Sequence, residues 1–457
     1  MTNFYQIKLC MINGSDISKI YLETLNDKTY MRYSRNSQTK HTIITQSHYI
    51  NEANASEDLL FGIRTITDNR LVGTIRCRIN KFNKSIELGF LIFKGSENKG
   101  YASETLKYFI EELGFFFQDM TLVIGTDKKN LPMQRIASKQ NFIMESEVKS
   151  NSTLRFTRKI KNSPNTYDLT LAMKLLKSRK IGIVAHDPGG ANQIIWLIKK
   201  LNSEILAYLS GPAVNIFARS QILFKSVSNQ SELKTCDLVI TGSSSTQDFE
   251  KNVIRYLRRE EIPNLTVLDH WVNYSNRFNP DATPSVFATT NEEAFELAKN
   301  KFKNSQVFLL PDLQLLTYKK VIRNFKSRED FVLVLLEPIS DSNGEFSCTI
   351  DTINEMVDFS IRLNKVRNLD GIILRLHPSQ QNNANLRLHL TGMYPNTTIS
   401  LNEDLIDDLL ISRIAIGANS YALYLAHKCE IDTMSLFANK PEHWTNSYPG
   451  ILPFFSL

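Results

Sequence analysis

The sequence predicts an α/β protein in which a mixed central sheet with flanking helices precedes a pair of doubly wound parallel sheets. Three observations carry this prediction. Strand-like and helix-like segments alternate along the whole chain. After residue 180, short apolar runs between turn residues are typical of buried parallel strands. The length of 457 residues suits two or three domains, and the charged fraction of 22% is that of a globular protein.

The chain is expected to divide into a first domain, a linker and two later domains. The first domain spans residues 1–160 and the linker spans 161–179, where polar residues and Pro164 interrupt the apolar pattern. The later domains are expected at 180–300 and 301–457, with the seam between them within residues 290–330. Each would hold its own hydrophobic core.

The first domain alternates strands with two helices. An Asp-Asn turn after Thr67 separates the first two strands, and the helices show apolar residues at helical spacing, such as Leu106, Phe109 and Leu113. The expected strands are 59–67, 70–80, 85–93, 121–125, 142–148 and 152–158, and the expected helices are 103–117 and 131–140.

The rest of the chain begins with a short helix at 169–178 and continues as a βα alternation. Helices are expected between the strands, for example at 292–303, 349–364 and 421–428. The expected strands are 181–185, 204–209, 238–241, 265–268, 286–289, 306–310, 331–336, 371–376, 397–399, 414–417 and 433–436.

Composition excludes several classes of protein. No apolar run approaches the roughly 18 residues of a membrane helix, and the N-terminus lacks the pattern of a secretion signal. Five scattered cysteines without a CxxC pair argue against a disulfide framework or a zinc site and favour the cytoplasm. Residues 1–160 hold 23 Lys and Arg against 16 Asp and Glu, which suits either an ordinary surface or an anionic ligand such as a phosphate-bearing cofactor. We expect no nucleic-acid partner, because no long basic stripe is present.

A strand, a glycine-bearing loop and a helix occur in succession within residues 86–104. The first turn of a helix leaves backbone N–H groups without intrahelical partners, and the helix dipole favours negative charge there. Gly100 allows a close approach of the backbone, and Lys99 adds a positive charge. The segment therefore suits a pyrophosphate. A plain turn is the alternative.

This stretch closely resembles the acyl-CoA pyrophosphate loop of the GNAT acetyltransferases, Gln/Arg-x-x-Gly-x-Gly/Ala, here Glu97-x-x-Gly100-x-Ala102. The segment 30–34 is similar to the substrate-side segment of the branch that acetylates proteins and sugars, and 71–75 is similar to a central strand of the family. Asn130 and the Lys-Gln-Asn-Phe at 139–142 resemble the family's closing motif. The resemblance covers about residues 3–160.

The resemblance implies an acetyl-CoA-dependent transfer to an amine. It implies Glu87 as the general base, with a role as an ordinary strand residue left open, and makes His41 and His48 weaker candidates. It implies Tyr30 and Arg32 as substrate-binding residues. The implied acetyl-CoA-binding residues are Phe90, Ile92, Asn98, Lys99, Gly100, Tyr101, Ala102, Ser103 and Asn130.

Three positions depart from the family pattern. Glu97 replaces Gln or Arg, so an ionised side chain there cannot donate to phosphate. Ala137 replaces the tyrosine that often serves as general acid, which leaves water to return a proton to the thiolate. Asn141 replaces a glycine, and asparagine is the next most tolerant residue for a left-handed turn. These departures leave open that the domain has lost its activity.

A second predicted site lies at the carboxyl ends of strands after residue 180, where ligands bind in doubly wound sheets. His186 and Asp187 are candidate bases at a glycine loop, although bracing of the turn is an alternative role. Packing between domains is likewise an alternative for the aromatic residues after Asp269. The candidate ligand-binding residues here are Gly189, Gly190, Asn192, Ser243, Ser244, Asp269 and His270.

Two further segments complete this second site. His377 and Pro378 end one strand, and Asn419 and Ser420 precede a helix whose start would hold a diphosphate. The pairing resembles glycosyltransferases of the two-Rossmann type, GT-B, over about residues 180–457, although this length is short for that fold. The resemblance implies a nucleotide-sugar substrate, and the absence of an Asp-x-Asp motif or metal-ligand spacing predicts no metal requirement.

Together these features predict a bifunctional enzyme of bacterial surface-glycan biosynthesis. An N-terminal N-acetyltransferase would act on an amino sugar, and a C-terminal unit would be a nucleotide-sugar-dependent glycosyltransferase. The C-terminal unit is alternatively a nucleotide-sugar hydrolase, an epimerase or a non-catalytic glycan-binding module, and acetylation of a protein is an alternative for the first domain. Peripheral contact with a membrane is compatible with the sequence, and it leaves the oligomeric state open.

Overall fold

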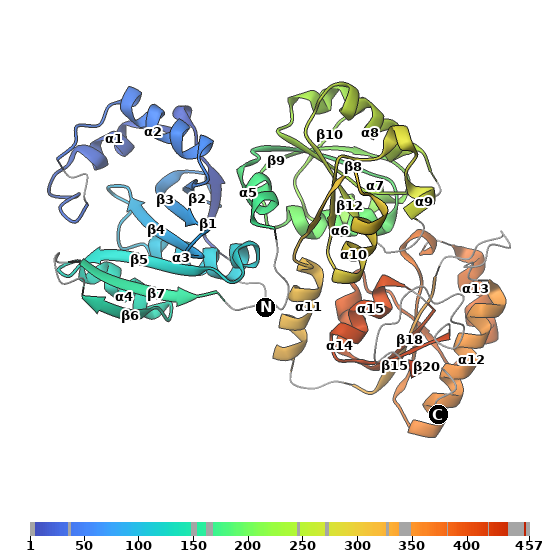
Figure 1. Cartoon of the computed structure of the whole chain (residues 1–457). Helices are drawn as coiled ribbons and strands as arrows, with labels where there is room; N and C mark the ends of the chain where they lie inside the picture. Colours follow the sequence, from blue (N-terminus) through green and yellow to red (C-terminus); the bar gives the residue numbers. More distant parts are fainter. Residues whose placement is uncertain are drawn as a thin grey trace. The chain divides into compact units, whose positions relative to one another are not determined.

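The computed structural model contains three β-sheets that follow one another along the chain (Figure 1). The chain forms two compact units, one made of residues 1–186, 190–210 and 217–311, the other of 187–189, 211–216 and 312–457. The structure describes residues 5–34, 38–147, 153–160, 168–244, 247–269, 274–325, 329–337, 349–381, 383–418, 420–436 and 452–453.

The first sheet is mixed, as the sequence predicts. Its strand order is β1-β2-β3-β4-β5-β7-β6, and all neighbouring pairs are antiparallel except β4 and β5, which are parallel. Strand β1 is an addition to the strands expected from the sequence. The strands are β1 (Ile7–Met11), β2 (Leu59–Thr65), β3 (Leu71–Asn80), β4 (Ser85–Ile92), β5 (Thr121–Asp127), β6 (Ile143–Glu147) and β7 (Thr153–Lys159).

Four helices accompany the first sheet: α1 (Lys19–Asn26), α2 (Ile43–Ala55), α3 (Tyr101–Tyr108) and α4 (Leu131–Lys139). The expected helix over 103–117 is α-helical only in its first part, because a π-helical turn at Phe109–Leu113 and a 3₁₀ turn at Gly114–Phe117 follow α3. Phe109, Leu113 and Phe117 are all buried, so the apolar spacing predicted the packing correctly but not the backbone geometry.

The second sheet is entirely parallel, with strand order β10-β9-β8-β11-β12-β13-β14. The chain adds strands on one side of β8 up to β10 and then on the other side from β11 onward, so a topological switch point lies between β8 and β11. The strands are β8 (Lys180–Ala185), β9 (Glu204–Leu209), β10 (Lys225–Ser226), β11 (Leu238–Thr241), β12 (Asn264–Leu268), β13 (Val286–Thr289) and β14 (Gln306–Leu309). The helices are α5 (Leu169–Lys177), α6 (Pro188–Ile198), α7 (Pro212–Arg219), α8 (Phe249–Arg259), α9 (Tyr274–Arg277) and α10 (Glu292–Lys301).

The second sheet extends past residue 301, where the sequence analysis begins the last domain. Strand β14 pairs with β13 from Val286↔Gln306 to Thr289↔Leu309. The chain passes to the other compact unit between Pro311 and Asp312. A single parallel strand carries no local signal of the sheet to which it belongs, so its pairing became visible only in the fold.

The third sheet repeats the same doubly wound arrangement, in the order β17-β16-β15-β18-β19-β20 and with parallel pairs throughout. Its switch point lies between β15 and β18. The strands are β15 (Phe331–Leu335), β16 (Gly371–Arg375), β17 (Thr398–Ile399), β18 (Ser412–Gly417), β19 (Asp432–Ser435) and β20 (Leu452–Pro453). The helices are α11 (Leu313–Asn324), α12 (Ile350–Arg367), α13 (Ala384–Met393), α14 (Leu405–Leu410) and α15 (Tyr421–Lys428).

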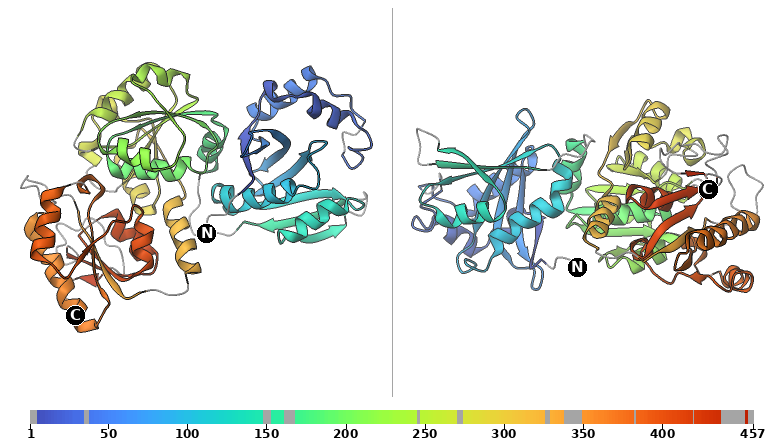
Figure 2. Two further views of the ribbon diagram at one scale, coloured as in Figure 1. Left: turned by 180° about the vertical axis from the view of Figure 1, so that it is seen from behind. Right: turned by 90° about the horizontal axis from the view of Figure 1, so that it is seen from below.

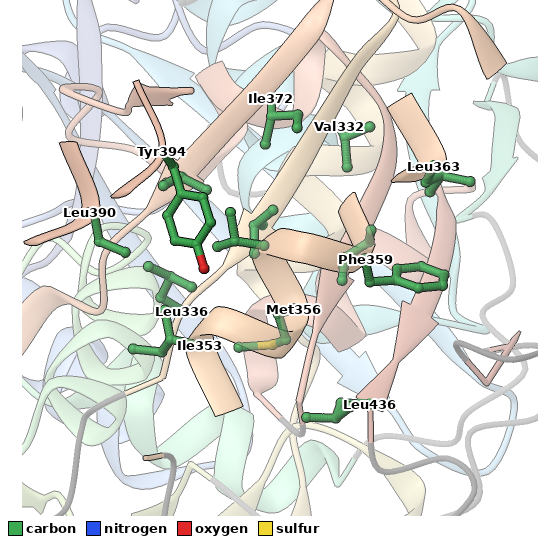
Figure 3. Close-up of a cluster of buried hydrophobic side chains, with 14 of the residues drawn as sticks. Val332, Leu336, Ile353, Met356, Phe359, Leu363, Ile372, Leu390, Tyr394 and Leu436 are labelled. Atoms are coloured by element: carbon green, nitrogen blue, oxygen red, sulfur yellow. The ribbon is translucent and has the colours of Figure 1, made fainter. Parts of the chain in front are cut away.

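One face of the third sheet packs against α12 and α13, the two orange helices that lie side by side in Figures 1 and 2. Val332 and Ile372 from the strands meet Met356 of α12 and Leu390 of α13 in this core (Figure 3). Helices α14 and α15 contact β18. Over the described part of the chain, no helix is both long and apolar enough to cross a membrane.

Candidate functional site

The two parallel strands of the first sheet diverge part of the way along their length. Strands β4 and β5 are paired only from Ser85↔Thr121 to Glu87↔Val123. Their outer edges remain paired, because β4 continues beside β3 up to Ile92 and β5 continues beside β7 up to Asp127. The facing edges beyond Glu87 and Val123 therefore present backbone N–H and C=O groups to whatever lies between them.

The loop after β4 leads into α3 through a left-handed residue. Gly100 is the N-cap of α3, with φ of 82° and no side-chain capping bond, and a Cβ atom there would meet nothing within 4 Å. Asn98 also has positive φ, at 57°. Glu97, Asn98, Lys99 and Gly100 are exposed, and Tyr101, Ala102 and Ser103 form the first turn of the helix. This accessible helix start, with Lys99 beside it, fits an anion such as a pyrophosphate.

Glu87 stands where β4 and β5 separate. Its carboxylate lies 3.6 Å from the Arg78 guanidinium on the adjacent strand, and both side chains are about half exposed. Gly89, two residues along the same strand face, has open space around the position of a Cβ atom. A carboxylate beside open space at a strand divergence can accept a proton from an incoming amine. The predicted acetyl-CoA residues Phe90 and Ile92 are half-buried in the divergent part of β4.

The predicted substrate-binding residues Tyr30 and Arg32 make contacts within the protein. The Tyr30 hydroxyl donates a hydrogen bond of 2.9 Å to the carbonyl of Ile92, at the end of β4. Exposed Arg32 donates to the carbonyl of Thr29 at 2.9 Å and lies over the ring of Tyr33. Tyr30 thus holds the segment after α1 against β4, whereas Arg32 remains accessible to a ligand.

Asn130, Ala137 and Asn141 occupy structural positions around α4. The Asn130 side chain is the N-cap of α4 and accepts a hydrogen bond of 3.4 Å from the backbone N–H of Met133. Ala137 is fully buried, and its methyl group has no proton to donate. Asn141 has φ of 56°, which confirms the left-handed turn that the sequence predicts there.

The switch point of the second sheet is braced by a buried carboxylate. Glu250 at the start of α8 is 1% exposed and accepts a hydrogen bond of 2.8 Å from the backbone N–H of His186, directly after β8. The predicted glycine loop is instead the first turn of α6, because this helix begins at Pro188. A Cβ atom on Gly190 would lie 3.1 Å from Cα of Gly242, so Gly190 permits contact between α6 and the end of β11. Asn192 lies in the same helix and is half-buried.

The ends of β11 and β12 are joined through an arginine that the sequence analysis missed. Arg277 of α9 donates to the Ser243 hydroxyl at 2.8 Å and pairs with the Asp269 carboxylate at 2.5 Å. Both charged side chains are nearly buried, with 8% and 13% exposure. Ser244 is also buried, and its hydroxyl accepts from the N–H of Gln247 at 3.1 Å. These contacts hold the strand ends in place, and they engage three side chains predicted to bind a ligand, those of Ser243, Ser244 and Asp269.

In the other compact unit, His377 follows β16 and caps a short 3₁₀ turn that begins at exposed Pro378. Its Nδ1 atom accepts the backbone N–H of Ser379 at 3.2 Å, which leaves the proton of a neutral ring on Nε2. His377 keeps part of its surface accessible, yet loss of solvation lowers the pKa of its ring to about 4, and the Asp187 carboxylate only partly opposes this effect. His377 therefore offers a neutral N–H donor at pH 7.

The start of α15 is capped and braced. The Ser420 hydroxyl is its N-cap and accepts from the N–H of Leu423 at 3.3 Å. The next residue, Tyr421, donates its hydroxyl proton to the Asp312 carboxylate, which also caps α11. Burial raises the pKa of Asp312 to about 6. Asp187 belongs to the same compact unit as these residues.

Two predicted residues, His270 and Asn419, lie outside the described residues. Arg277, Glu250 and Asp312 are the charged groups that sequence analysis overlooked. The sequence around each of them is that of an ordinary helix or loop. Only their burial distinguishes them from exposed charged residues. Among the described residues, no cluster of three or more His, Cys, Asp or Glu side chains could hold a metal ion.

Comparisons with known proteins agree with this description of the first sheet. Residues 7–143 match the model of the acetyltransferase (GNAT) domain family. No curated protein matches the sequence. Similar solved structures include three acetyltransferases. The RimL ribosomal L7/L12 α-N-protein acetyltransferase in complex with coenzyme A is 13% identical, covers 35% of this chain and 96% of its own, and has a TM-score of 0.29.

The other two structures cover a similar share of the chain. A GNAT-family acetyltransferase from Bacillus anthracis is 21% identical, with coverage of 33% of this chain and 92% of its own and a TM-score of 0.28. The microcin C7 self-immunity acetyltransferase MccE in complex with acetyl-CoA and AMP is 15% identical, with coverage of 34% and 93% and a TM-score of 0.30.

Proposed function

We propose that the N-terminal part of the chain, a GNAT acetyltransferase domain over residues 7–143, transfers the acetyl group of acetyl-CoA to the amino group of an amino sugar. The observation that carries the transfer reaction is the divergence of β4 and β5 after Glu87↔Val123, next to the open start of α3. The divergent strands offer backbone hydrogen bonds to an extended thioester arm, and the helix start offers N–H groups to its pyrophosphate.

The proposed chemistry uses one side chain and the backbone. The amine attacks the thioester carbonyl carbon, and the Glu87 carboxylate accepts the proton that the amine loses. Backbone N–H groups on the divergent part of β4 stabilise the negative charge on the carbonyl oxygen. The carbon–sulfur bond then breaks, and the departing thiolate takes a proton from water, since Ala137 carries no proton donor.

A charge reversal next to the helix start tests the acetyl-CoA site. Lys99→Glu should weaken CoA binding roughly five- to tenfold by calorimetry, because it brings negative charge to the site of the pyrophosphate. Lys159→Glu is the matched control, since Lys159 is also exposed but pairs with Thr121 at the closed end of β5. Equal CoA affinities for the two variants would contradict the proposed pyrophosphate position.

We further propose that the two doubly wound sheets bind a nucleotide sugar and transfer its sugar to an acceptor. The first supporting observation is the strand order, which is 3-2-1-4-5-6-7 in the second sheet and 3-2-1-4-5-6 in the third. The second is that His377 and the start of α15 lie at carboxyl ends of strands in the third sheet. In this proposal the neutral His377 ring donates a hydrogen bond to the diphosphate, and the N–H groups at the start of α15 share its charge. The amino-sugar substrate of the first domain is inferred from this second activity.

The second activity is tested by incubating the whole protein with a panel of nucleotide sugars. Mass spectrometry then identifies retained nucleotides, released free sugar and acetylated products. Free sugar without an acceptor would favour a nucleotide-sugar hydrolase, and a changed sugar that stays on its nucleotide would favour an epimerase. Retention of CoA without any nucleotide would support only the acetyltransferase activity and would favour a non-catalytic binding module for the doubly wound sheets.

A further inference from the structure

The face of the first sheet that carries Glu87 is open where β4 and β5 diverge. The alternate residues Ile86 and Leu88 of β4 are buried, so the opposite face of this strand is covered. On the Glu87 face, Gly89 of β4 and Gly125 of β5 are both exposed. A Cβ atom on Gly89 would meet nothing within 4 Å. An acceptor molecule can therefore approach Glu87 from this face.

Arg78 of β3 lies on the same face, opposite Glu87. The two residues are register partners in the antiparallel pair of β3 and β4, so their side chains point to the same side of the sheet. The guanidinium Nη1 lies 3.6 Å from the Glu87 carboxylate, which is an ion pair longer than a hydrogen bond. The Arg78 side chain is 50% exposed. Its N–H groups are therefore accessible to a ligand beside the candidate base.

The other arginine of this strand face, Arg76, is held by the fold. It donates two hydrogen bonds to the Asp58 carboxylate, at 2.7 and 3.1 Å, and lies over the ring of Tyr49. Its side chain is only 23% exposed. Among the charged side chains that the structure describes, Glu87 is the one that pairs with Arg78. An exposed pair of this length contributes little to stability, so Arg78 can turn to a ligand without loss to the fold.

We propose that Arg78 is a specificity-determining residue that binds a phosphate group of the amine acceptor. This inference rests on the proposed acetyltransferase function and narrows its acceptor to a phosphorylated amino sugar. A guanidinium group binds phosphate through two parallel charge-assisted hydrogen bonds, and its five N–H donors can serve Glu87 as well.

The distance between Arg78 and Glu87 limits where the phosphate lies on the acceptor. The two side chains are 3.6 Å apart, so the phosphate that one binds and the amine that the other deprotonates belong on neighbouring carbons of the sugar. A 2-amino sugar with a 1-phosphate meets this requirement. The phosphate is either that of a free sugar phosphate or part of a nucleotide diphosphate sugar.

Steady-state acetylation by the whole protein tests the inference, with glucosamine, its 1-phosphate, its 6-phosphate and UDP-glucosamine as acceptors. The wild-type kcat/KM should be at least roughly tenfold higher for the 1-phosphate or for UDP-glucosamine than for glucosamine, because the phosphate adds a charge-assisted contact. The 6-phosphate should gain less, since its phosphate is remote from the amine. The better of the two preferred acceptors identifies the source of the phosphate.

Arg78→Gln should reduce this preference to within about twofold of unity, mainly through a higher KM for the phosphorylated acceptor. Loss of the ion pair with Glu87 affects every acceptor alike, so the ratio of the two kcat/KM values isolates the phosphate contact. Arg70→Gln is the matched control and should keep the wild-type preference. Arg70 is also half exposed and pairs with an acidic residue, Asp68, at 3.5 Å, but it lies beside the turn between β2 and β3.

CoA binding, measured by calorimetry, reports whether the variants are folded. Arg78→Lys, which keeps the charge without the planar fork, should keep part of the preference. Equal kcat/KM values for glucosamine and its phosphorylated forms in the wild type, or an unchanged preference in Arg78→Gln, would overturn this inference alone. If the wild type binds CoA and acetylates none of the four amines, the proposed amino-sugar acceptor is wrong as well. If CoA does not bind, the acetyltransferase function itself fails.

Discussion

Two glutamates of the first domain have different surroundings and different expected roles. Glu87 pairs with Arg78 across two strands and stands at the divergence of β4 and β5. Glu97 is exposed and lies in the loop before α3. The residue types are the same, but only Glu87 is placed beside the space between the strands. Position in the sheet, and not side-chain chemistry, makes Glu87 the candidate base.

Glu87→Gln should lower kcat for acetyl transfer roughly 100-fold, because the amide cannot accept the proton of the attacking amine. The KM for acetyl-CoA should stay within about twofold, since the helix start and the strand edges are unaltered. Glu57→Gln is the control, because Glu57 also pairs with a cation, Lys81, but lies before β2. An unchanged kcat in Glu87→Gln would mean that this carboxylate only pairs with Arg78.

Asp312 should make the stability of its unit depend on pH. Its folded pKa of about 6 exceeds the ordinary value of 3.8, because burial outweighs the hydrogen bonds from Leu315 and Tyr421. The folded protein therefore binds this proton more tightly than the unfolded chain. The resulting stabilisation is fully present below pH 4 and is lost as the pH rises through 6.

Asp312→Asn removes this titration and keeps a side chain that can cap α11. Between pH 4 and 6.5 the unfolding free energy of the wild type should fall by roughly 2 kcal/mol relative to the variant. Chemical unfolding at several pH values measures the difference. Parallel curves for the two proteins would show that Asp312 has an ordinary pKa.

At the scale of elements, the start of α6 depends on the absence of a side chain. Gly190 faces Gly242 at the end of β11, where a Cβ atom would come within 3.1 Å of backbone. The pair allows the helix to begin directly beside the switch point of the second sheet. From the sequence, Gly190 was expected to leave room for a ligand. In the structure it instead allows α6 to pack closely against the end of β11.

Gly190→Ala should destabilise the unit that contains the second sheet by about 1–3 kcal/mol, because backbone has to move. Gly392→Ala should have the opposite effect and stabilise its unit by about 0.5–1 kcal/mol. Gly392 lies in helix α13, where a Cβ atom meets nothing within 4 Å. The unfolding midpoints of the two variants check both signs, and a neutral Gly190→Ala would show that α6 can shift without loss.

At the scale of the whole molecule, three sheets carry three separate sets of strand pairs. The first sheet is mixed and the other two are parallel. The third sheet has its own apolar core, the cluster around Met356 and Leu390. We therefore expect acetyl-CoA binding by the first domain to be independent of the stability of the third sheet. Damage to the third core should leave acetyl-CoA binding by the first domain intact.

Ile414→Val, a fully buried substitution in β18, tests this independence. It should lower the stability of the third-sheet unit by about 0.5–1.5 kcal/mol through the loss of one methylene group. CoA affinity, measured by calorimetry at a temperature where both proteins are folded, should remain within twofold of wild type. A parallel loss of CoA binding would show that the units unfold and function together.

Much of the element pattern follows from local sequence. The buried strand at 181–185 and the helix at 421–428 occur where apolar runs and periodicity place them. The element β1 was missed because its alternation is short, and the π-helical turn after α3 was missed because apolar spacing does not distinguish helix types. The pairing of β14 with β13 was missed because pairing partners are not encoded locally.

The sequence by itself indicated the resemblance of the first domain to GNAT acetyltransferases, which the family match over residues 7–143 supports, because the strand, the loop with Gly100 and the helix start are contiguous in the chain. The tertiary structure alone decided which side chains meet. It joined Arg277 to Asp269 and Ser243, Asp312 to Tyr421, and Tyr30 to Ile92. These contacts bring together residues from different elements, and their energies arise from burial and distance, which no local pattern contains.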